Sequence, residues 1–217
     1  MNFEQARFNM IEQQVRTWDV LDANVLNLMD KLQREDFVPK KYQGVAYADV
    51  QVPLAHEQVM LPPREIGRIL QALQVQPEEH VLEIGTGTGY LTALLAMQAA
   101  HVVSVEMFAD LSAAADSNCQ KHAYSNITFQ VGNAAHGWED NTSFSIICIT
   151  GAIPRLTESW KRQLKIGGRL FAIVGTAPVM QAILVTRVHA EEWEQQILYE
   201  TLLPMLVDAQ PLPQFEF

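Results

Sequence analysis

The residues of this chain with the clearest chemical potential form a glycine-rich loop that a carboxylate follows at a set distance. Val81–Tyr90 reads VLEIGTGTGY, so an apolar, strand-like run ends at Gly85 and a helix is expected to begin near Tyr90. Glycines let the backbone turn sharply and approach a ligand where a Cβ would collide. Glu106 lies 21 residues after Gly85, at the spacing where a carboxylate meets ribose hydroxyls. The pattern predicts an adenosine ligand; the alternative is a glycine turn needed only for packing, with Glu106 a solvated strand end.

The spacing of the glycines indicates which adenosine ligand is bound. Dinucleotide sites read G-x-G-x-x-G, whereas Gly85, Gly87 and Gly89 give G-x-G-x-G. An acid, Glu83, also stands two residues before the first glycine. Acids suit a ligand that carries an ammonium and a sulfonium but no phosphate. The pattern therefore favours S-adenosylmethionine over NAD.

Composition and charge argue against several other classes of function. The chain has 217 residues, a formal net charge of −10 and a pI of about 5.0. We see no block of Lys or Arg, so nucleic acid and anionic membranes are disfavoured as partners. Cys119 and Cys148 are expected to be buried thiols, and no His, Cys or carboxylate pair has metal-ligand spacing. Without a signal-peptide-like N-terminus or a membrane-length apolar run, a cytoplasmic protein is predicted.

Alternating apolar runs and helical patterns predict the elements that position these residues. Nearly all-apolar strands separated by helices indicate a parallel sheet covered on both faces. Two adjacent extended runs then predict an antiparallel hairpin, and two early helices predict a cap built onto the core. The expected strands cover residues 80–85, 101–106, 127–132, 144–150, 168–175, 181–189 and 193–202. The expected helices cover residues 3–15, 25–32, 64–74, 90–99, 108–122 and 155–164.

Several motifs resemble one enzyme family in their order along the chain. VLEIGTGTGYLTALLA, VVSVE, VGNAAHGW and LKIGGRLFAIVG are similar to class I S-adenosylmethionine-dependent methyltransferases. MIEQQVRTWDVLDANVL, REDFVPKKYQGVAYADVQVPLAHEQ and GWEDNTSFSIICITGAIPRL resemble the protein-L-isoaspartate O-methyltransferase family, and the resemblance runs from about residue 7 to residue 188. It implies a doubly wound α/β fold, Rossmann-like, with a mostly parallel seven-stranded sheet, an N-terminal helical cap and an antiparallel C-terminal addition. It also implies one domain over 1–217, with the cap and substrate-side loop in 1–62 and the cofactor-binding core in 63–217.

The resemblance further implies how S-adenosylmethionine, with S-adenosylhomocysteine as its product, is held. The loop Gly85–Gly87 would hold the methionine end, Glu106 the ribose, and Met107 would pack on the adenine. Where the family reads Gly-Asp-Gly, this chain has Gly132-Asn133-Ala134, so the uncharged Asn133 carbonyl would accept from the adenine amino group. The expected cofactor contacts are Gln58, Glu83, Gly85, Thr86, Gly87, Gly89, Glu106, Met107, Asn133, Ala134 and Thr150.

The stretch HEQVMLPP, residues 56–63, departs from the family on the acceptor side. The family writes Gly-Gln-Thr-Ile-Ser-x-Pro there, with hydroxyls beside the methyl group and the substrate carboxylate, whereas this chain has Val59-Met60-Leu61. The expected catalytic positions are Val59, Leu61 and His56; His56 would orient a substrate or act as a base, or be only a hydrogen-bonded structural residue. Since Val and Leu offer a carboxylate no hydrogen bond, little or no methylation of isoaspartyl peptides is predicted.

Three interpretations of this loop stay open. The preferred one is a methyltransferase with a changed acceptor, either a less polar small molecule or another protein site. The first alternative is true isoaspartyl repair, because an ionised nucleophile and an activated methyl group need mainly positioning. The second is a non-catalytic cofactor-binding or partner-binding protein whose Val59–Leu61 plugs the acceptor site. The C-terminal LLPMLVDAQPLPQFEF is expected to pack on the sheet or on another subunit, or else to cover the pocket.

Overall fold

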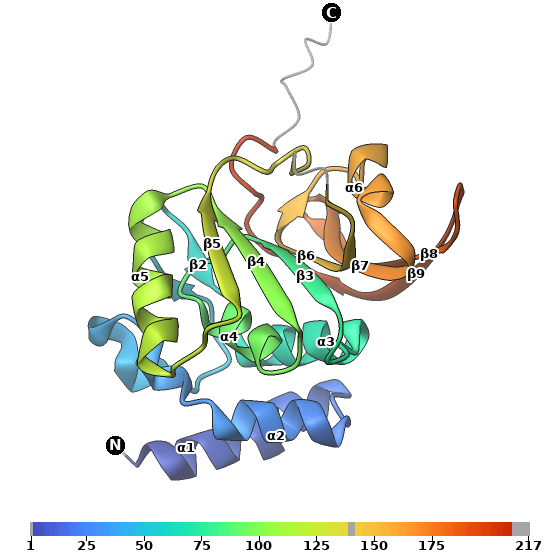
Figure 1. Cartoon of the computed structure of the whole chain (residues 1–217). Coiled ribbons are helices and arrows are strands. Elements are labelled where there is room, and N and C mark those ends of the chain that lie inside the picture. The colour runs from blue at the N-terminus through green and yellow to red at the C-terminus, as the bar shows by residue number, and fades with distance from the viewer. Residues whose placement is uncertain (1, 139–141, 210–217) are drawn as a thin grey trace, which may run out of the picture.

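The chain is built around one seven-stranded sheet. The computed structural model describes residues 2–138 and 142–209, and its main strands lie in the order β5-β4-β3-β6-β7-β8-β9 (Figure 1). The first five run parallel, whereas β8 pairs antiparallel with both of its neighbours, β7 and β9. The strands are β3 (His80–Ile84), β4 (His101–Glu106), β5 (Ile127–Val131), β6 (Phe144–Ile153), β7 (Leu164–Thr176), β8 (Val179–His189) and β9 (Glu192–Thr201). The predicted fold class, including its antiparallel C-terminal addition, is confirmed.

Helices cover both faces of this sheet. They are α3 (Pro63–Leu73), α4 (Tyr90–Ala96), α5 (Ala109–Lys121) and α6 (Glu158–Arg162), the last shorter than expected. Alternate side chains of β3 enter different hydrophobic clusters, since Val81 packs with residues of α3 and α4 and Leu82 packs with Trp160 of α6. Strands buried on both faces must be apolar throughout, which is why β3 and β6 were recognisable from their sequences.

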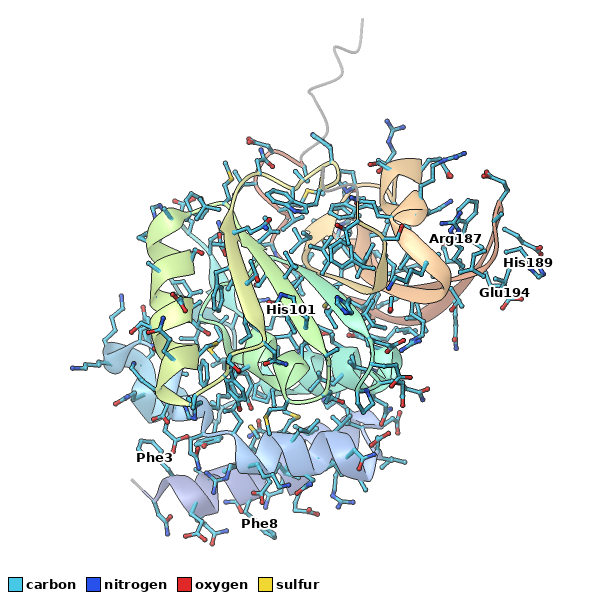
Figure 2. All side chains as sticks on the ribbon, in the orientation of Figure 1. Phe3, Phe8, His101, Arg187, His189 and Glu194 are labelled. Atoms are coloured by element: carbon cyan, nitrogen blue, oxygen red, sulfur yellow. The ribbon has the colours of Figure 1, made fainter. Side chains whose placement is uncertain are left out.

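The N-terminal residues form a helical cap against α3. The cap contains α1 (Phe3–Met10), a π-helical turn η1 (Ile11–Val15), α2 (Ala23–Lys31), and the 3-10 turns η2 (Arg16–Trp18), η3 (Arg34–Asp36) and η4 (Lys40–Val45). Asp22 caps α2, because its carboxylate accepts two backbone N–H groups of the first turn. Figure 2 shows Phe8 on the outer face of α1, pointing away from the sheet, whereas Met10 joins α3 in one buried cluster. The single-domain organisation with its boundary at 62/63 stays a prediction.

Two short segments bring further residues to the carboxyl ends of the parallel strands. β1 (Val52–Pro53) and β2 (Val59–Met60) pair antiparallel, so the stretch HEQVMLPP belongs to a hairpin. After β9, Met205 forms a bridge with Ala152 near the end of β6. Residues 210–217, on which part of the C-terminal expectation falls, lie outside the described residues. Within the described residues, no helix has both the length and the apolar character that crossing a membrane requires.

Candidate functional site

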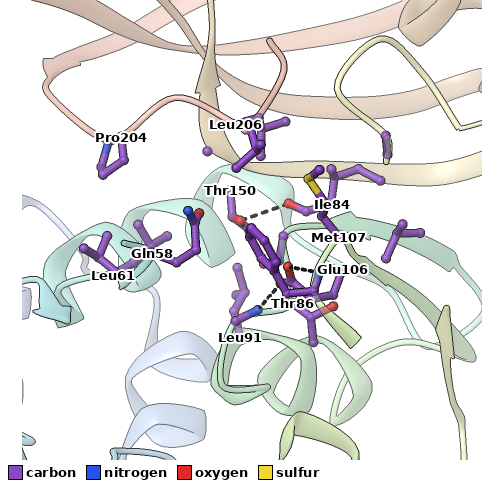
Figure 3. A pocket seen from close by; sticks show the side chains of 18 of the residues that line it. Gln58, Leu61, Ile84, Thr86, Leu91, Glu106, Met107, Thr150, Pro204 and Leu206 are labelled. Atoms are coloured by element: carbon purple, nitrogen blue, oxygen red, sulfur yellow. Dashed lines mark hydrogen bonds between the residues drawn. The ribbon is translucent and has the colours of Figure 1, made fainter. Parts of the chain in front are cut away.

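A cleft opens where β3, β4, β5 and β6 end (Figure 3). Its empty volume is about 950 Å³ with the mouth included, which suits a ligand of nucleoside size. Its walls come from the glycine loop, the strand ends, the β1–β2 hairpin and the segment after β9. Nine of the eleven expected cofactor residues line it, all except Glu83 and Gly89. Their spacing in the sequence is wide, and the parallel sheet brings them to one edge.

The turn after β3 is shaped around Gly85. Its φ is +91°, and a Cβ there would lie 2.3 Å from Thr150 Oγ1. The Thr150 hydroxyl reaches the carbonyl oxygens of Ile84 and Gly85, both at 2.9 Å. Thr150 therefore fixes the glycine loop from the neighbouring strand β6. Thr150, expected as a cofactor contact, also lines the cleft.

Glu106, at the end of β4, is held by two backbone groups. Its Oε2 accepts the N–H of Gly87 at 2.9 Å and its Oε1 accepts the N–H of Phe108 at 3.2 Å. The side chain is buried yet lines the cleft. Each carboxylate oxygen can accept more than one hydrogen bond, so the pair stays able to receive two further hydroxyl donors. Glu106 thus ties the glycine loop to β4 and presents a fixed double acceptor, which is the requirement for binding a ribose diol.

Glu83 does not line the cleft, contrary to expectation. Side chains alternate along a strand, so Ile84 faces the cleft whereas Glu83 points to the opposite face. There its Oε2 accepts hydrogen bonds from Thr92 at 2.5 Å and Ser104 at 2.6 Å, and its Oε1 has no partner. Burial raises the pKa of Glu83 to about 7, opposed by the two hydroxyl donors. The acid supports the loop from beneath, because Ser104 in turn contacts Thr86 at 2.6 Å.

Gly89 also has a structural reason to be glycine. Its φ is +84°, and a Cβ would meet the Cβ and the carbonyl oxygen of Ala115, both at 3.1 Å. The first turn of α4 can therefore approach α5 closely only without a side chain at this position. The third glycine of the motif packs two helices together and lies behind the ligand surface.

Asn133 lines the cleft but its side chain is already engaged. Its Oδ1 accepts the N–H of Ala135 at 3.0 Å, and its Nδ2 donates to Asp208 Oδ2 at 2.8 Å. Asn133 Oδ1, the expected acceptor for an adenine amino group, can thus accept only one further hydrogen bond. Asp208 was missed by sequence reasoning, because a contact across 75 residues has no local signal.

The β1–β2 hairpin forms the apolar wall of the cleft. Gln58, Val59, Met60 and Leu61 line it, and the last two are buried. The buried guanidinium of Arg34 donates to the carbonyl oxygen of Leu61 at 2.7 Å, which fixes the end of the hairpin. The expected positions Val59 and Leu61 therefore do reach the site, and they offer it no side-chain hydroxyl.

His56 lies outside the residues that line the cleft. Its Nε2 lies 2.9 and 3.0 Å from the two carboxylate oxygens of Asp110, and its ring stacks on Phe108 with centroids 4.0 Å apart. The contact with His56 lowers the pKa of Asp110. The structure thus favours the structural alternative for His56, which joins the turn of the hairpin to the start of α5.

The charges around the cleft limit what it can bind. Among the described residues that line it there is no Lys, Arg or His, and Glu106 is the one carboxylate. A phosphate would find no cationic side chain there, whereas a sulfonium or an ammonium would meet no like charge. Met107 and Phe108 add apolar surface next to Glu106, where a base attached to the ribose would lie. The residues therefore fit S-adenosylmethionine better than a dinucleotide, as the glycine spacing predicted.

Comparison with known proteins gives consistent matches over nearly the whole chain. A model of the family described as Protein-L-isoaspartate(D-aspartate) O-methyltransferase matches residues 5–210. A protein-L-isoaspartate O-methyltransferase of Koribacter versatilis is 38% identical over 188 residues, which are 87% of this chain and 84% of the relative. One from Brucella anthropi is 33% identical over 213 residues, 98% of either chain. A crystal structure from Plasmodium falciparum, of a protein assigned to the same enzymes and in complex with S-adenosyl-L-homocysteine, has a TM-score of 0.81 at 18% identity. It covers 95% of this chain and 98% of its own, and it shows the shared fold.

Proposed function

We propose that this chain, which belongs to the protein-L-isoaspartate O-methyltransferase family, methylates the free carboxylate of isoaspartyl residues in proteins. It is an S-adenosylmethionine-dependent methyltransferase, and the observation that carries the proposal is the family match over residues 5–210. The relatives do not support the changed acceptor that the loop sequence favoured, nor a non-catalytic protein. The first alternative, isoaspartyl repair, is the better interpretation.

The cofactor binds in the cleft between the glycine loop and Glu106. Bound S-adenosylmethionine supplies a methyl group that its sulfonium activates for transfer. Glu106 would accept hydrogen bonds from the ribose hydroxyls, and the Gly85–Gly87 backbone would hold the methionine end. Met107 would pack on the adenine. The absence of a cationic side chain among the described lining residues supports this arrangement.

The acceptor needs positioning more than proton transfer. An isoaspartyl carboxylate is ionised near neutral pH, so no base has to remove a proton before it attacks. The cleft fits that requirement, because Glu106 is the one carboxylate among its described lining residues and both of its oxygens are held by backbone N–H groups. Met60 and Leu61 exclude water from the acceptor side, where it would compete for hydrogen bonds.

The backbone of β2 supplies the hydrogen bond that the missing hydroxyls would have made. The Leu54 N–H donates to the Gln58 carbonyl at 2.8 Å, so this pair of the hairpin is hydrogen-bonded. Pairs alternate along an antiparallel ladder, and the next pair, Pro53 with Val59, is of the non-bonded kind. The Val59 N–H thus points away from β1 and is free to donate to an acceptor carboxylate. A backbone N–H donor in this loop is the route by which the sequence-based prediction of lost repair activity could fail.

The proposal is tested with two synthetic peptides that differ only in one isoaspartyl or aspartyl linkage. The protein is incubated with methyl-labelled S-adenosylmethionine and either peptide, and the label is followed into the peptide. We expect label in the isoaspartyl peptide, released as methanol by mild base because the product is a methyl ester. Base-stable label, or label in neither peptide although S-adenosylhomocysteine binds, would overturn the proposal.

A further inference from the structure

The segment Leu202–Ala209, called the strap below, is fastened to the end of β6. The Ala152 N–H donates to the Pro204 carbonyl and the Leu206 N–H donates to the Ala152 carbonyl, both at 2.9 Å. The Leu206 side chain covers Gly151, where a Cβ would come within 2.6 Å of it. Pro204–Val207 line the cleft, and Figure 3 shows Pro204 and Leu206 on the opposite side of it from Leu91.

The far end of the strap reaches the loop after β5. Asp208 Oδ2 accepts a hydrogen bond from Asn133 Nδ2 at 2.8 Å, and Ala209 beside it is buried. In the sheet, β3 and β4 lie between β6 and β5. The strap therefore crosses the ends of the two strands that carry the glycine loop and Glu106. Its course closes one side of the cofactor cleft.

The identity of residue 133 matters for this contact. The Ala135 N–H holds Asn133 Oδ1 at 3.0 Å, and this orients the amide NH₂ toward Asp208. An Asp at 133 would accept the same N–H, but its second oxygen would then face the carboxylate of Asp208. Two carboxylates at hydrogen-bonding distance repel each other, or one must take up a proton. An Asn at 133 is therefore compatible with an acid at 208, whereas an Asp at 133 is not.

We propose that Asn133 and Asp208 form a clasp, which holds the strap across the bound cofactor and slows the release of the cofactor. Asp208 is a positioning residue, because it acts on the ligand through Asn133 and through the lining residues Pro204–Val207. The inference rests on the proposed cofactor site. Asn133→Asp adds one charge without a change in size, so it should break the hydrogen bond to Asp208 and open the clasp. The double exchange, Asn133→Asp with Asp208→Asn, should restore the hydrogen bond with residue 208 as the donor and residue 133 as the acceptor.

The clasp is tested by binding and by hydrogen exchange. Asn133→Asp should weaken the binding of S-adenosylhomocysteine about tenfold, with most of the change in the release rate. The double exchange should return the affinity to within about twofold of the original. Without any ligand, the backbone amides of the strap should exchange faster in Asn133→Asp and return toward their original rates in the double exchange. Asn24→Asp, which adds the same charge at an exposed position of α2, is the matched control and should change neither measurement.

Three outcomes are distinguishable. Unchanged exchange and affinity in Asn133→Asp, with the variant folded by circular dichroism, would overturn the clasp. A double exchange that stays as weak as the single variant would also overturn it, because the weakening would then not depend on the pairing of residues 133 and 208. If the unaltered chain binds no S-adenosylhomocysteine, the proposed function fails, whereas exchange in the free protein still decides whether the clasp exists.

Discussion

At the scale of single residues, the two acids near the glycine loop, Glu83 in β3 and Glu106 in β4, have different roles. Glu106 faces the cleft, with both oxygens oriented by backbone N–H groups. Glu83 faces the interior and accepts hydrogen bonds from Thr92 and Ser104. Glutamate therefore lines the cleft in β4, whereas in the neighbouring strand β3 it stabilises the residues beneath the glycine loop. Each role leads to a different measurable effect.

For Glu106 we predict a loss of cofactor affinity. Glu106→Ala removes a charged acceptor for two hydroxyls and also frees the Gly87 N–H that orders the loop. The affinity for S-adenosylhomocysteine should fall about a hundredfold. Isothermal titration calorimetry measures this directly, and the melting temperature of the free protein shows whether the variant is folded. Wild-type affinity in a folded Glu106→Ala protein would remove this residue from the binding site.

For Glu83 we predict a pH-dependent stability. Its pKa is raised from 4.5 to about 7 in the folded protein, chiefly by burial. Between those values the folded state holds more of the proton than the unfolded state does, so the free energy of unfolding falls as pH rises through this window. The loss is on the order of 3 kcal/mol as an upper bound. Urea unfolding from pH 4.5 to pH 8 should show this slope in the wild type and lose it in Glu83→Gln; parallel profiles would contradict the account.

At the scale of elements, the glycine loop and the hairpin are two of the segments that form the walls of the cleft. The loop turns where β3 ends and is fixed by Thr150 of β6. The hairpin is fixed by Arg34 and by the contact of His56 with Asp110. Both depend on backbone geometry, so substitutions that alter the backbone are the sharpest probes.

A pair of glycine substitutions separates steric conflict from backbone strain. Gly85 and Gly167 both have left-handed φ, +91° and +82°, but a Cβ at 85 meets Thr150 whereas nothing lies within 4 Å of one at 167. Gly167→Ala should therefore cost about 1 kcal/mol of unfolding free energy, from strain alone. Gly85→Ala should cost about 3 kcal/mol and also weaken cofactor binding. Equal losses in denaturant unfolding would show that the Thr150 contact has no energetic importance.

The hairpin is tested by removing one backbone donor. Val59→Pro deletes the N–H that points away from β1, and it leaves the ladder to β1 intact because Val59 pairs with Pro53 without a hydrogen bond. The KM for the isoaspartyl peptide should rise about tenfold, while S-adenosylhomocysteine binds as before. Val59→Ala is the control and should behave like the wild type. Should Val59→Thr raise the rate strongly and Val59→Pro leave it unchanged, the side chains and not the backbone would decide acceptor binding.

At the scale of the whole molecule, the sequence was most informative where local pattern and function coincide. The glycine loop, Glu106 and the apolar strands are read from spacing alone, because a buried parallel sheet requires continuous apolar runs. The hairpin was not predicted, since two-residue strands have no measurable periodicity. The sequence left open whether the strap packs on the sheet or covers the pocket, and its described residues do both. The contact of Asp208 with Asn133 depends on chain segments that meet only in the fold. The preference for a changed acceptor came from the missing side-chain hydroxyls, and it gave too little weight to the backbone N–H groups that this loop could still offer.

The most direct test of the proposed activity compares kcat/KM for the isoaspartyl and aspartyl forms of one peptide. If the chain recognises the isoaspartyl linkage, the isoaspartyl form should be preferred by at least about a hundredfold, because a carboxylate misplaced by one methylene loses both its alignment with the methyl group and its backbone donor. Rates should be followed by S-adenosylhomocysteine release under identical conditions. A ratio near one, or no turnover of either peptide by a protein that binds S-adenosylhomocysteine, would contradict the account.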